Sequence, residues 1–299
     1  MTDHVSVSHR GTLMKGIGGF YTVLSEEGDT HVLRCMKKIR RLGISPLPGD
    51  NVRFIPGAGE EHGWITDILP RKSVCLRPPV ANISMLVIVI APVPAPNLLL
   101  ADKLISRSLA QGIKAVIAVN KTDLDQDFAP YIIDEYRASG LEIFPVSAVR
   151  RDGLQLLRRC MTDELCCFAG QSGVGKSTLL NSTLDLDLET GEISKKIMRG
   201  KNTTRQTELF IKDGIRVMDT AGFNLLENER ELPPEELKKR YPEFRQFEGK
   251  CRFRECLHDS EPGCAVSLAA EEGIISHGRV ERYRILLEEA RNEWRDRYD

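Results

Sequence analysis

The architecture of this chain is set by one segment, Gly170-Gln171-Ser172-Gly173-Val174-Gly175-Lys176-Ser177. An apolar run, 165–169, precedes it, and a helix-forming run, 177–184, follows it. Glycines let backbone N–H groups wrap closely around phosphates, and the next helix directs its positive end at them. The pattern predicts a phosphate-binding loop at a strand end in an α/β sheet. Lys176 would neutralise the terminal phosphates, and Ser177 would bind Mg²⁺.

A second motif, Asn120-Lys121-Thr122-Asp123, directly follows the apolar run 114–119 and selects the base. The Asp123 carboxylate can accept hydrogen bonds from N1–H and the exocyclic amine of guanine, whereas adenine has no donor at N1. The motif therefore favours GTP and makes an ATPase the least favoured alternative. We expect Asn120 to brace the loops, Lys121 to lie along the base, and the Ala148 N–H to meet the guanine oxygen.

The predicted GTP-binding residues come from three segments. They are Asn120, Lys121, Thr122 and Asp123, then Ser147 and Ala148, then Gly170, Gln171, Ser172, Gly173, Val174, Gly175, Lys176, Ser177 and Thr178.

A third motif, Asp219-Thr220-Ala221-Gly222, supplies the switch region. Asp219 is expected to hold magnesium through water, and the Gly222 N–H to contact the terminal phosphate. Thr204 is the expected remaining magnesium ligand, with Thr203 the alternative. The predicted magnesium set is Ser177, Thr204 and Asp219. The predicted catalytic set is Lys176, Thr204 and Gly222.

Phe223 follows Gly222, at the place where Ras-type enzymes carry the glutamine that orients the attacking water. A phenyl ring can neither donate nor accept that hydrogen bond. We therefore expect slow intrinsic hydrolysis unless a partner supplies the missing group.

The order of the motifs is unusual. The base motif, 120–123, precedes the phosphate loop, 170–177, and the switch motif, 219–222, follows it. Most GTPases begin with the phosphate loop and end with the base motif. The sequence therefore predicts a circularly permuted P-loop GTPase domain over 73–230, with its ligand groups after the carboxyl ends of parallel strands.

Residues 1–72 show short, alternating apolar runs separated by turn residues, which is typical of strands. The runs are 17–24, 30–35, 51–55 and 64–69. They predict a small OB-type β-barrel that binds RNA, because the loops of such barrels commonly hold nucleic acid. A barrel that serves only as a docking spacer is the alternative. The RNA-binding candidates here are Arg34, Lys37, Lys38, Arg40 and Arg41, and the alternative for each is a solvated charge.

Residues 231–299 contain the cluster Cys-x4-Cys-x-His-x5-Cys, formed by Cys251, Cys256, His258 and Cys264. Three thiolates and one imidazole predict a structural Zn²⁺ site that leaves no position for water. Unligated core cysteines are the alternative. Helices are expected over 234–241 and 279–298. Arg252 and Arg254, inside the cluster, are further RNA-binding candidates.

The composition narrows the class of protein. The 299 residues carry a net charge of −1, so any RNA contact must come from local basic patches. The start lacks a signal-peptide pattern, and the apolar run 83–93 is too short to cross a bilayer. We expect a cytoplasmic monomer without membrane contact, whose eight cysteines stay reduced.

These features together resemble one family, the circularly permuted small ribosomal subunit biogenesis GTPases of the RsgA or YjeQ/YloQ type. The resemblance also rests on Gly18-Gly19-Phe20-Tyr21, Pro48-Gly49-Asp50-Asn51-Val52, Arg77-Pro78 and Ala81-Asn82. It implies a GTPase that binds the small subunit late in assembly, contacts its rRNA through the barrel and the zinc domain, and hydrolyses GTP faster there. The resemblance also implies the zinc assignment.

Two positions depart from the family pattern. Members often read Gly-x-His-Thr-Thr, whereas this chain has Gly200-Lys201-Asn202-Thr203-Thr204, and Ala221 stands where many carry proline. Asn202 cannot transfer a proton as histidine can. From the residues alone, two alternatives stay open: a GTP-dependent RNA-binding placeholder with negligible turnover, and a GTPase acting on another RNA or a protein partner. Basic patches indicate phosphate attraction without identifying the RNA.

Overall fold

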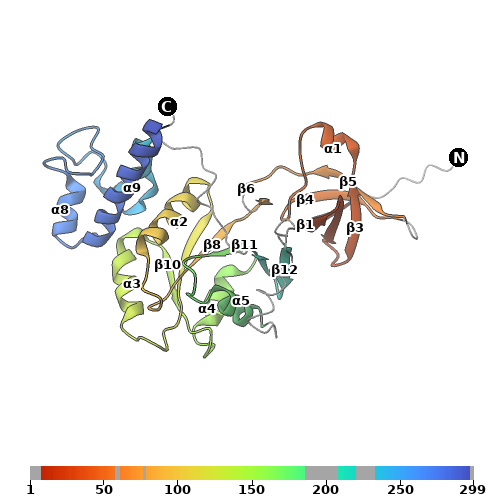
Figure 1. The fold of residues 1–299 in the computed structure, drawn as a ribbon, viewed down its shortest axis with the longest axis horizontal. Helices are drawn as coiled ribbons and strands as arrows, with labels where there is room; N and C mark the ends of the chain where they lie inside the picture. The colour runs from red at the N-terminus through yellow and green to blue at the C-terminus, as the bar shows by residue number, and fades with distance from the viewer. Residues whose placement is uncertain (1–7, 58–60, 77–78, 186–207, 220–232, 297–299) are drawn as a thin grey trace. The chain divides into compact units, whose positions relative to one another are not determined.

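The computed structural model describes residues 8–57, 61–76, 79–185, 208–219 and 233–296 (Figure 1). The chain divides into two units, one made of 1–85, 161–167 and 188–224, the other of 86–160, 168–187 and 225–299. The domain boundaries that the sequence suggests, after residues 72 and 230, remain a prediction. No helix in the described residues has the length and apolar character that crossing a bilayer requires.

The N-terminal strands close into a barrel in the order β1-β2-β3-β5-β4 (Figure 1). The strands are β1 (His9–Ile17), β2 (Phe20–Ser25), β3 (Thr30–Cys35), β4 (Asn51–Ile55) and β5 (Gly63–Ile68), and helix α1 (Lys37–Arg41) follows β3. Alternate residues point inward, so that Leu13, Val23, Leu33, Phe54 and Ile65 form a fully buried core. The predicted OB-type barrel is confirmed.

The predicted apolar run 17–24 is not one strand. Gly18 and Gly19 have φ angles of 58° and 84°, in the left-handed region that glycine adopts without a steric penalty. They turn the chain between β1 and β2, which pair antiparallel with Ile17 opposite Phe20.

In the described part of the chain, a six-stranded sheet has the order β10-β9-β8-β11-β13-β12. Its strands are β8 (Met85–Ile90), β9 (Lys114–Val119), β10 (Glu142–Pro145), β11 (Leu165–Ala169), β12 (Glu208–Lys212) and β13 (Ile215–Asp219). The pairs β10–β9 and β11–β13 are parallel, and β12–β13 is an antiparallel hairpin. All six residues of β8 are buried, as expected of a strand covered on both faces. A small ribbon, β6 (Val74–Leu76) with β7 (Pro79–Ala81), precedes this sheet in the chain.

Helices alternate with these strands, as an α/β sheet requires. They are α2 (Leu98–Ala110), α3 (Phe128–Tyr136) with the 3-10 turn η1 (Arg137–Ser139), α4 (Leu154–Met161) and α5 (Lys176–Leu184).

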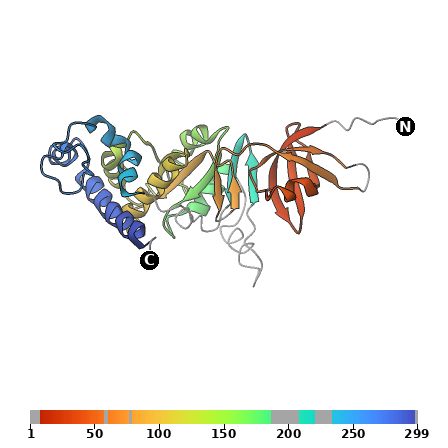
Figure 2. The same cartoon turned by 90° about the horizontal axis from the view of Figure 1, so that it is seen from above.

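The C-terminal part is helical, with α7 (Pro234–Leu237), η3 (Lys238–Arg240), η4 (Pro242–Phe247), α8 (Ala265–Glu271) and α9 (His277–Asp296). Figure 2 shows α9 in blue as one long, uninterrupted helix. It begins at His277 rather than at 279, and the Ser276 hydroxyl accepts a hydrogen bond from the Arg279 N–H in its first turn. The helix expected over 234–241 is instead two short pieces, α7 and η3. Tyr241, Phe244, Tyr283 and Leu287 form the core of this part.

Candidate nucleotide and metal sites

The phosphate loop joins β11 to α5. Gly170 and Gly175 have φ angles of 136° and 92°, and neither position has room for a side chain. A Cβ at Gly170 would lie 2.3 Å from the Val89 carbonyl oxygen, and one at Gly175 would lie 2.6 Å from Asn120 Nδ2. Glycine is therefore required at both places. The N-terminus of α5 follows the loop, and a helix N-terminus favours an anion.

Lys176 lies within the loop at the start of α5. Its Nζ donates hydrogen bonds of 2.8 Å to the carbonyl oxygens of Gly170 and Gln171. Burial lowers the pKa of Lys176, and nearby phosphate oxygens would favour its charged form. Ser177 and Thr178 occupy the first turn of the same helix and are half-buried. Ser172 is exposed.

Asn120 connects three loops at the carboxyl ends of their strands. Its side chain is buried, Nδ2 donates to the Val174 carbonyl at 2.9 Å, and Oδ1 accepts from the Ala148 N–H at 3.1 Å. This arrangement ties the base motif to the phosphate loop. The Ala148 N–H, predicted to meet the guanine oxygen, is directed at Asn120 in this structure, so its role toward guanine remains a prediction.

Lys121 and Asp123 project from the same loop. Lys121 Nζ donates 2.8 Å hydrogen bonds to the carbonyl oxygens of Val93 and Gly173, so its stem extends from the base motif to the phosphate loop. Asp123 Oδ1 accepts a 2.5 Å hydrogen bond from the Ser147 hydroxyl. That bond is the main reason the pKa of Asp123 is lowered. The bond favours the ionised form of the carboxylate, which is the form that can accept two hydrogen bonds. The Thr122 N–H donates to the Val146 carbonyl.

Asn97, at the N-terminus of α2, is a site residue that the motifs did not indicate. Its N–H donates to Gln171 Oε1 at 3.1 Å, and its own Oδ1 accepts from the Leu100 N–H as a helix cap. The phosphate loop is thus attached to α2. An asparagine before an apolar helix is a recognisable cap signal, but its contact with Gln171 depends on the fold.

The switch residues are only partly described. Thr203, Thr204, Gly222 and Phe223 lie outside the described residues. Asp219 is the last residue of β13, and its side chain is likewise outside the described part.

The Cys/His cluster is fully described. Ligand atoms of Cys251, Cys256, His258 and Cys264 all lie within 4.8 Å of one another. His258 Nδ1 is 3.6 Å from the sulfur atoms of Cys251 and Cys256 and 3.5 Å from that of Cys264. A tetrahedral zinc ion, about 2.3 Å from sulfur and about 2.0–2.1 Å from nitrogen, separates such ligands by about 3.6 Å. The donor set and its spacing therefore fit Zn²⁺.

The RNA-binding candidates are mostly exposed. Arg34 lies on β3, Lys37, Lys38 and Arg41 lie on α1, and Arg252 and Arg254 lie in the loop after Cys251. The Arg40 side chain is outside the described part. The Arg34 guanidinium carbon is 4.8 Å from the centroid of the Phe20 ring.

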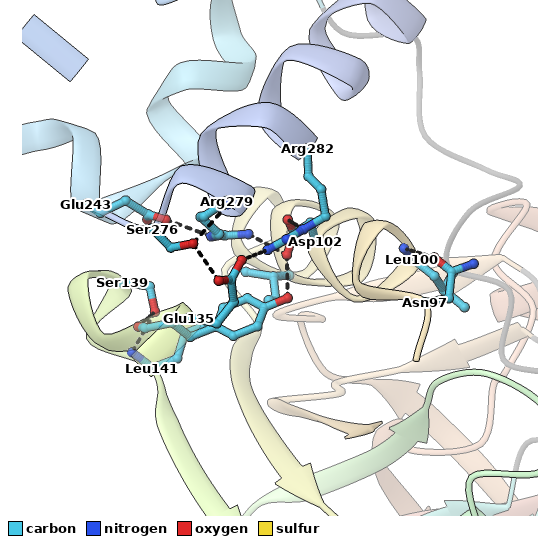
Figure 3. Close-up of polar contacts among 12 residues, drawn as sticks. Asn97, Leu100, Asp102, Glu135, Ser139, Leu141, Glu243, Ser276, Arg279 and Arg282 are labelled. Atoms are coloured by element: carbon cyan, nitrogen blue, oxygen red, sulfur yellow. Dashed lines mark hydrogen bonds and ion pairs between the residues drawn. The ribbon is translucent and has the colours of Figure 1, made fainter. Parts of the chain in front are cut away.

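A buried ion network, absent from the sequence analysis, joins α9 to α2, α3 and η4 (Figure 3). Arg279 is 1% exposed and pairs with Asp102 at 2.6 Å and Glu243 at 2.7 Å. Arg282 pairs with Asp102 and Glu135, both at 2.7 Å. The network attaches the C-terminal helices to the nucleotide-domain helices.

The loop, the base motif and the sheet define a P-loop GTPase whose motifs run in permuted order. Two solved structures have this fold. YjeQ from Thermotoga maritima matches with a TM-score of 0.80 and 29% identity over 95% of this chain and 99% of that chain. YloQ, described as a circularly permuted GTPase, matches with a TM-score of 0.79 and 29% identity over 98% of each chain.

The chain belongs to the RsgA GTPase family. The profile of the RsgA GTPase domain matches residues 68–229, and that of the RsgA N-terminal domain matches 10–65. A relative from Ruminiclostridium cellulolyticum is 41% identical over 279 residues, which is 91% of each chain. One from Caldanaerobacter subterraneus subsp. tengcongensis is 40% identical over 295 residues, 97% of this chain and 98% of its own. Both are named small ribosomal subunit biogenesis GTPase RsgA.

Proposed function

We propose that this protein binds GTP with Mg²⁺, hydrolyses it to GDP and phosphate, and binds the small ribosomal subunit, which accelerates the hydrolysis. The single observation that carries the choice of GTP is the Asp123 carboxylate at the end of the base motif, which accepts a hydrogen bond from the Ser147 hydroxyl. Guanine offers two donors to such a group, and adenine offers none at N1. The ribosomal partner is supported by family membership and by the names of the relatives.

The phosphate groups are held by the loop N–H groups and by Lys176. Ser177, Thr204 and Asp219 are the residues that would hold Mg²⁺, which neutralises charge on the phosphate oxygens when bound. The Gly222 N–H would contact the terminal phosphate. Because Phe223 cannot orient water, the isolated protein turns over slowly, and the subunit supplies or positions the missing group.

The C-terminal domain binds one structural Zn²⁺ through Cys251, Cys256, His258 and Cys264. No disulfide joins any of the eight cysteines, all of which the structure describes. We place the protein in the reducing cytoplasm as a monomer. The basic residues of the barrel and of the zinc loop contact rRNA phosphates.

The test is GTP turnover by the protein alone, with purified small subunits, and with large subunits as control. Stimulation by small subunits and not by large ones is the expected result. The variant Lys176→Ala, in the same mixtures, should show no stimulated turnover and reports contaminating activity. Tight subunit binding without stimulation would favour a placeholder with negligible turnover. Absence of binding would contradict the ribosomal partner and favour another RNA or a protein.

A further inference from the structure

The outer face of the barrel carries a row of three flat side chains from adjacent strands. In the strand registers, Phe20 of β2 is opposite Arg34 of β3, and Arg34 is opposite Trp64 of β5. Residues opposite each other share one face of a sheet. The inward positions beside them are occupied by Leu33 and Ile65, which are buried in the barrel core. Phe20, Arg34 and Trp64 therefore project from the outside of the barrel.

Two of these side chains are exposed, the third, Phe20, is half-buried, and Arg34 already lies over the Phe20 ring. Trp64 is 41% exposed, and Arg34 is exposed as well. The Arg34 guanidinium lies over the Phe20 ring, 4.8 Å from its centroid, and the His62 ring meets the same ring edge-on at 4.9 Å. Among the described residues, no carboxylate pairs with Arg34. The Arg34 guanidinium therefore remains able to bind an anionic ligand.

The charge on this end of the barrel favours an anionic partner. Helix α1 directly follows β3, so that Lys37, Lys38 and Arg41 are displayed beside the end of the strand that carries Arg34. The acidic residues between β2 and β3, Glu26, Glu27 and Asp29, lie at the opposite end of both strands, about 15 Å away at about 3.3 Å per residue. One exposed carboxylate, Glu61, lies two residues before β5, so the exposed cations Arg34, Lys37, Lys38 and Arg41 outnumber it.

We infer that Phe20, Arg34 and Trp64 form a stacking surface for unpaired RNA bases, with the α1 lysines and arginine on the adjoining phosphates. Aromatic rings and guanidinium planes stack on any base whose face is free, whereas bases inside a duplex are already covered by their neighbours. The inference rests on the proposed function and specifies it further: the barrel recognises a single-stranded or looped segment and not a regular helix.

Trp64 itself is the reporter. The chain has two tryptophans, so the variant Trp294→Phe leaves Trp64 as the only source of indole fluorescence. The probe is a single-stranded RNA of about 12 nucleotides, and the control is the duplex of the same length. Quenching of Trp64 emission by the single strand and not by the duplex is expected. Unchanged emission at saturating single strand would overturn the inference.

Affinity measurements separate stacking from charge. Trp64→Ala should weaken single-strand binding roughly 5- to 100-fold, leave duplex binding almost unchanged, and leave the salt dependence unaltered. Trp64→Phe should restore most of the affinity. Arg41→Gln, which removes one phosphate contact, should instead reduce the slope of log affinity against log salt by about 0.7. Equal losses for single strand and duplex in Trp64→Ala would overturn the inference, provided that Trp64→Phe melts like the wild type.

The inference and the proposed function fail in different ways. If small subunits stimulate GTP turnover and the single strand leaves Trp64 emission unchanged, only the stacking surface is wrong. If the single strand quenches Trp64 and small subunits neither bind nor stimulate, the ribosomal partner is wrong and the surface serves another RNA.

Discussion

The candidate metal cluster takes its four residues from 251–264, whereas the described groups of the proposed nucleotide site come from the loops after β9, β10 and β11. Three of these four residues, Cys256, His258 and Cys264, are buried, and the zinc ion that we propose there would hold the thiolates together. The nucleotide loops are held by hydrogen bonds among themselves, most of them through Asn120 and Lys121. A site formed within a short segment thus depends on its ligand for structure, and a site formed by a sheet is organised by the fold.

Removing zinc should produce the largest effect. Structural zinc sites contribute about 10–16 kcal/mol of apparent binding free energy to folding. Cys256→Ala should lose the metal and abolish the amide-exchange protection of 251–287, while GDP binding at the phosphate loop persists. Metal analysis and hydrogen exchange measure this. Cys160→Ala, which changes a cysteine on α4, should keep one zinc per chain. Loss of GDP binding together with zinc would show that the two sites are not independent.

The next largest effect is expected from the buried network between the two sites. Arg279→Leu leaves Glu243 buried without a cation and Asp102 paired with Arg282 alone, which costs about 3–5 kcal/mol of unfolding free energy. Urea denaturation measures the loss. Arg291→Leu on the same helix breaks a partly exposed pair with Asp259 and should cost at most about 1 kcal/mol. Equal stabilities of the two variants would contradict a structural role for the network.

Changing the base-reading carboxylate should alter specificity. Asp123→Asn replaces an acceptor by a donor that faces the guanine amine, which should cost about 3 kcal/mol, or roughly 100-fold in GTP affinity. Xanthine carries an oxygen at that position, so the variant should gain affinity for XTP. Calorimetry with both nucleotides measures the exchange. Asp125→Asn, which changes the side chain that accepts a hydrogen bond from the Phe128 N–H at the start of α3, should bind GTP normally. An Asp123→Asn protein that still prefers GTP would refute the assignment.

The smallest effect concerns the hydroxyl beside that carboxylate. Ser147→Ala should weaken GTP binding by about 1 kcal/mol, roughly fivefold. It should also raise the pKa of Asp123 toward its ordinary value, because the Ser147 bond is the main cause of the lowering. Only the ionised Asp123 carboxylate accepts both hydrogen bonds from guanine, one from N1–H and one from the exocyclic amine. As the pH falls, GTP affinity should therefore be lost at a higher pH in the variant than in the wild type.

The control for this titration is Ser182→Ala. This variant removes the hydroxyl that donates a hydrogen bond to the carbonyl oxygen of Ala148, the residue that follows Ser147. Its affinity profile against pH should coincide with that of the wild type. Coincident profiles for all three proteins would mean that Ser147 does not tune Asp123.

Motif chemistry accounts for most of what could be predicted. The phosphate loop, the base motif and the Cys/His cluster each require particular residue types at short, fixed spacings, so their order along the chain indicated a permuted GTPase with a zinc domain. The alternating runs indicated the barrel. Element ends were less predictable, as the run 17–24 shows, because the Gly18-Gly19 turn interrupts an apolar pattern that continues on both sides.

Residue types and local spacing were thus enough to indicate the chemistry of the sites and the kinds of domain. The pairing of distant groups came from the folded chain alone. Arg282 and Asp102 are 180 residues apart in sequence, and Trp64 faces Arg34 only because β3 and β5 pair in that register. Such contacts depend on packing and strand registration, which no local pattern encodes, since a shift of one residue would turn each side chain to the other face.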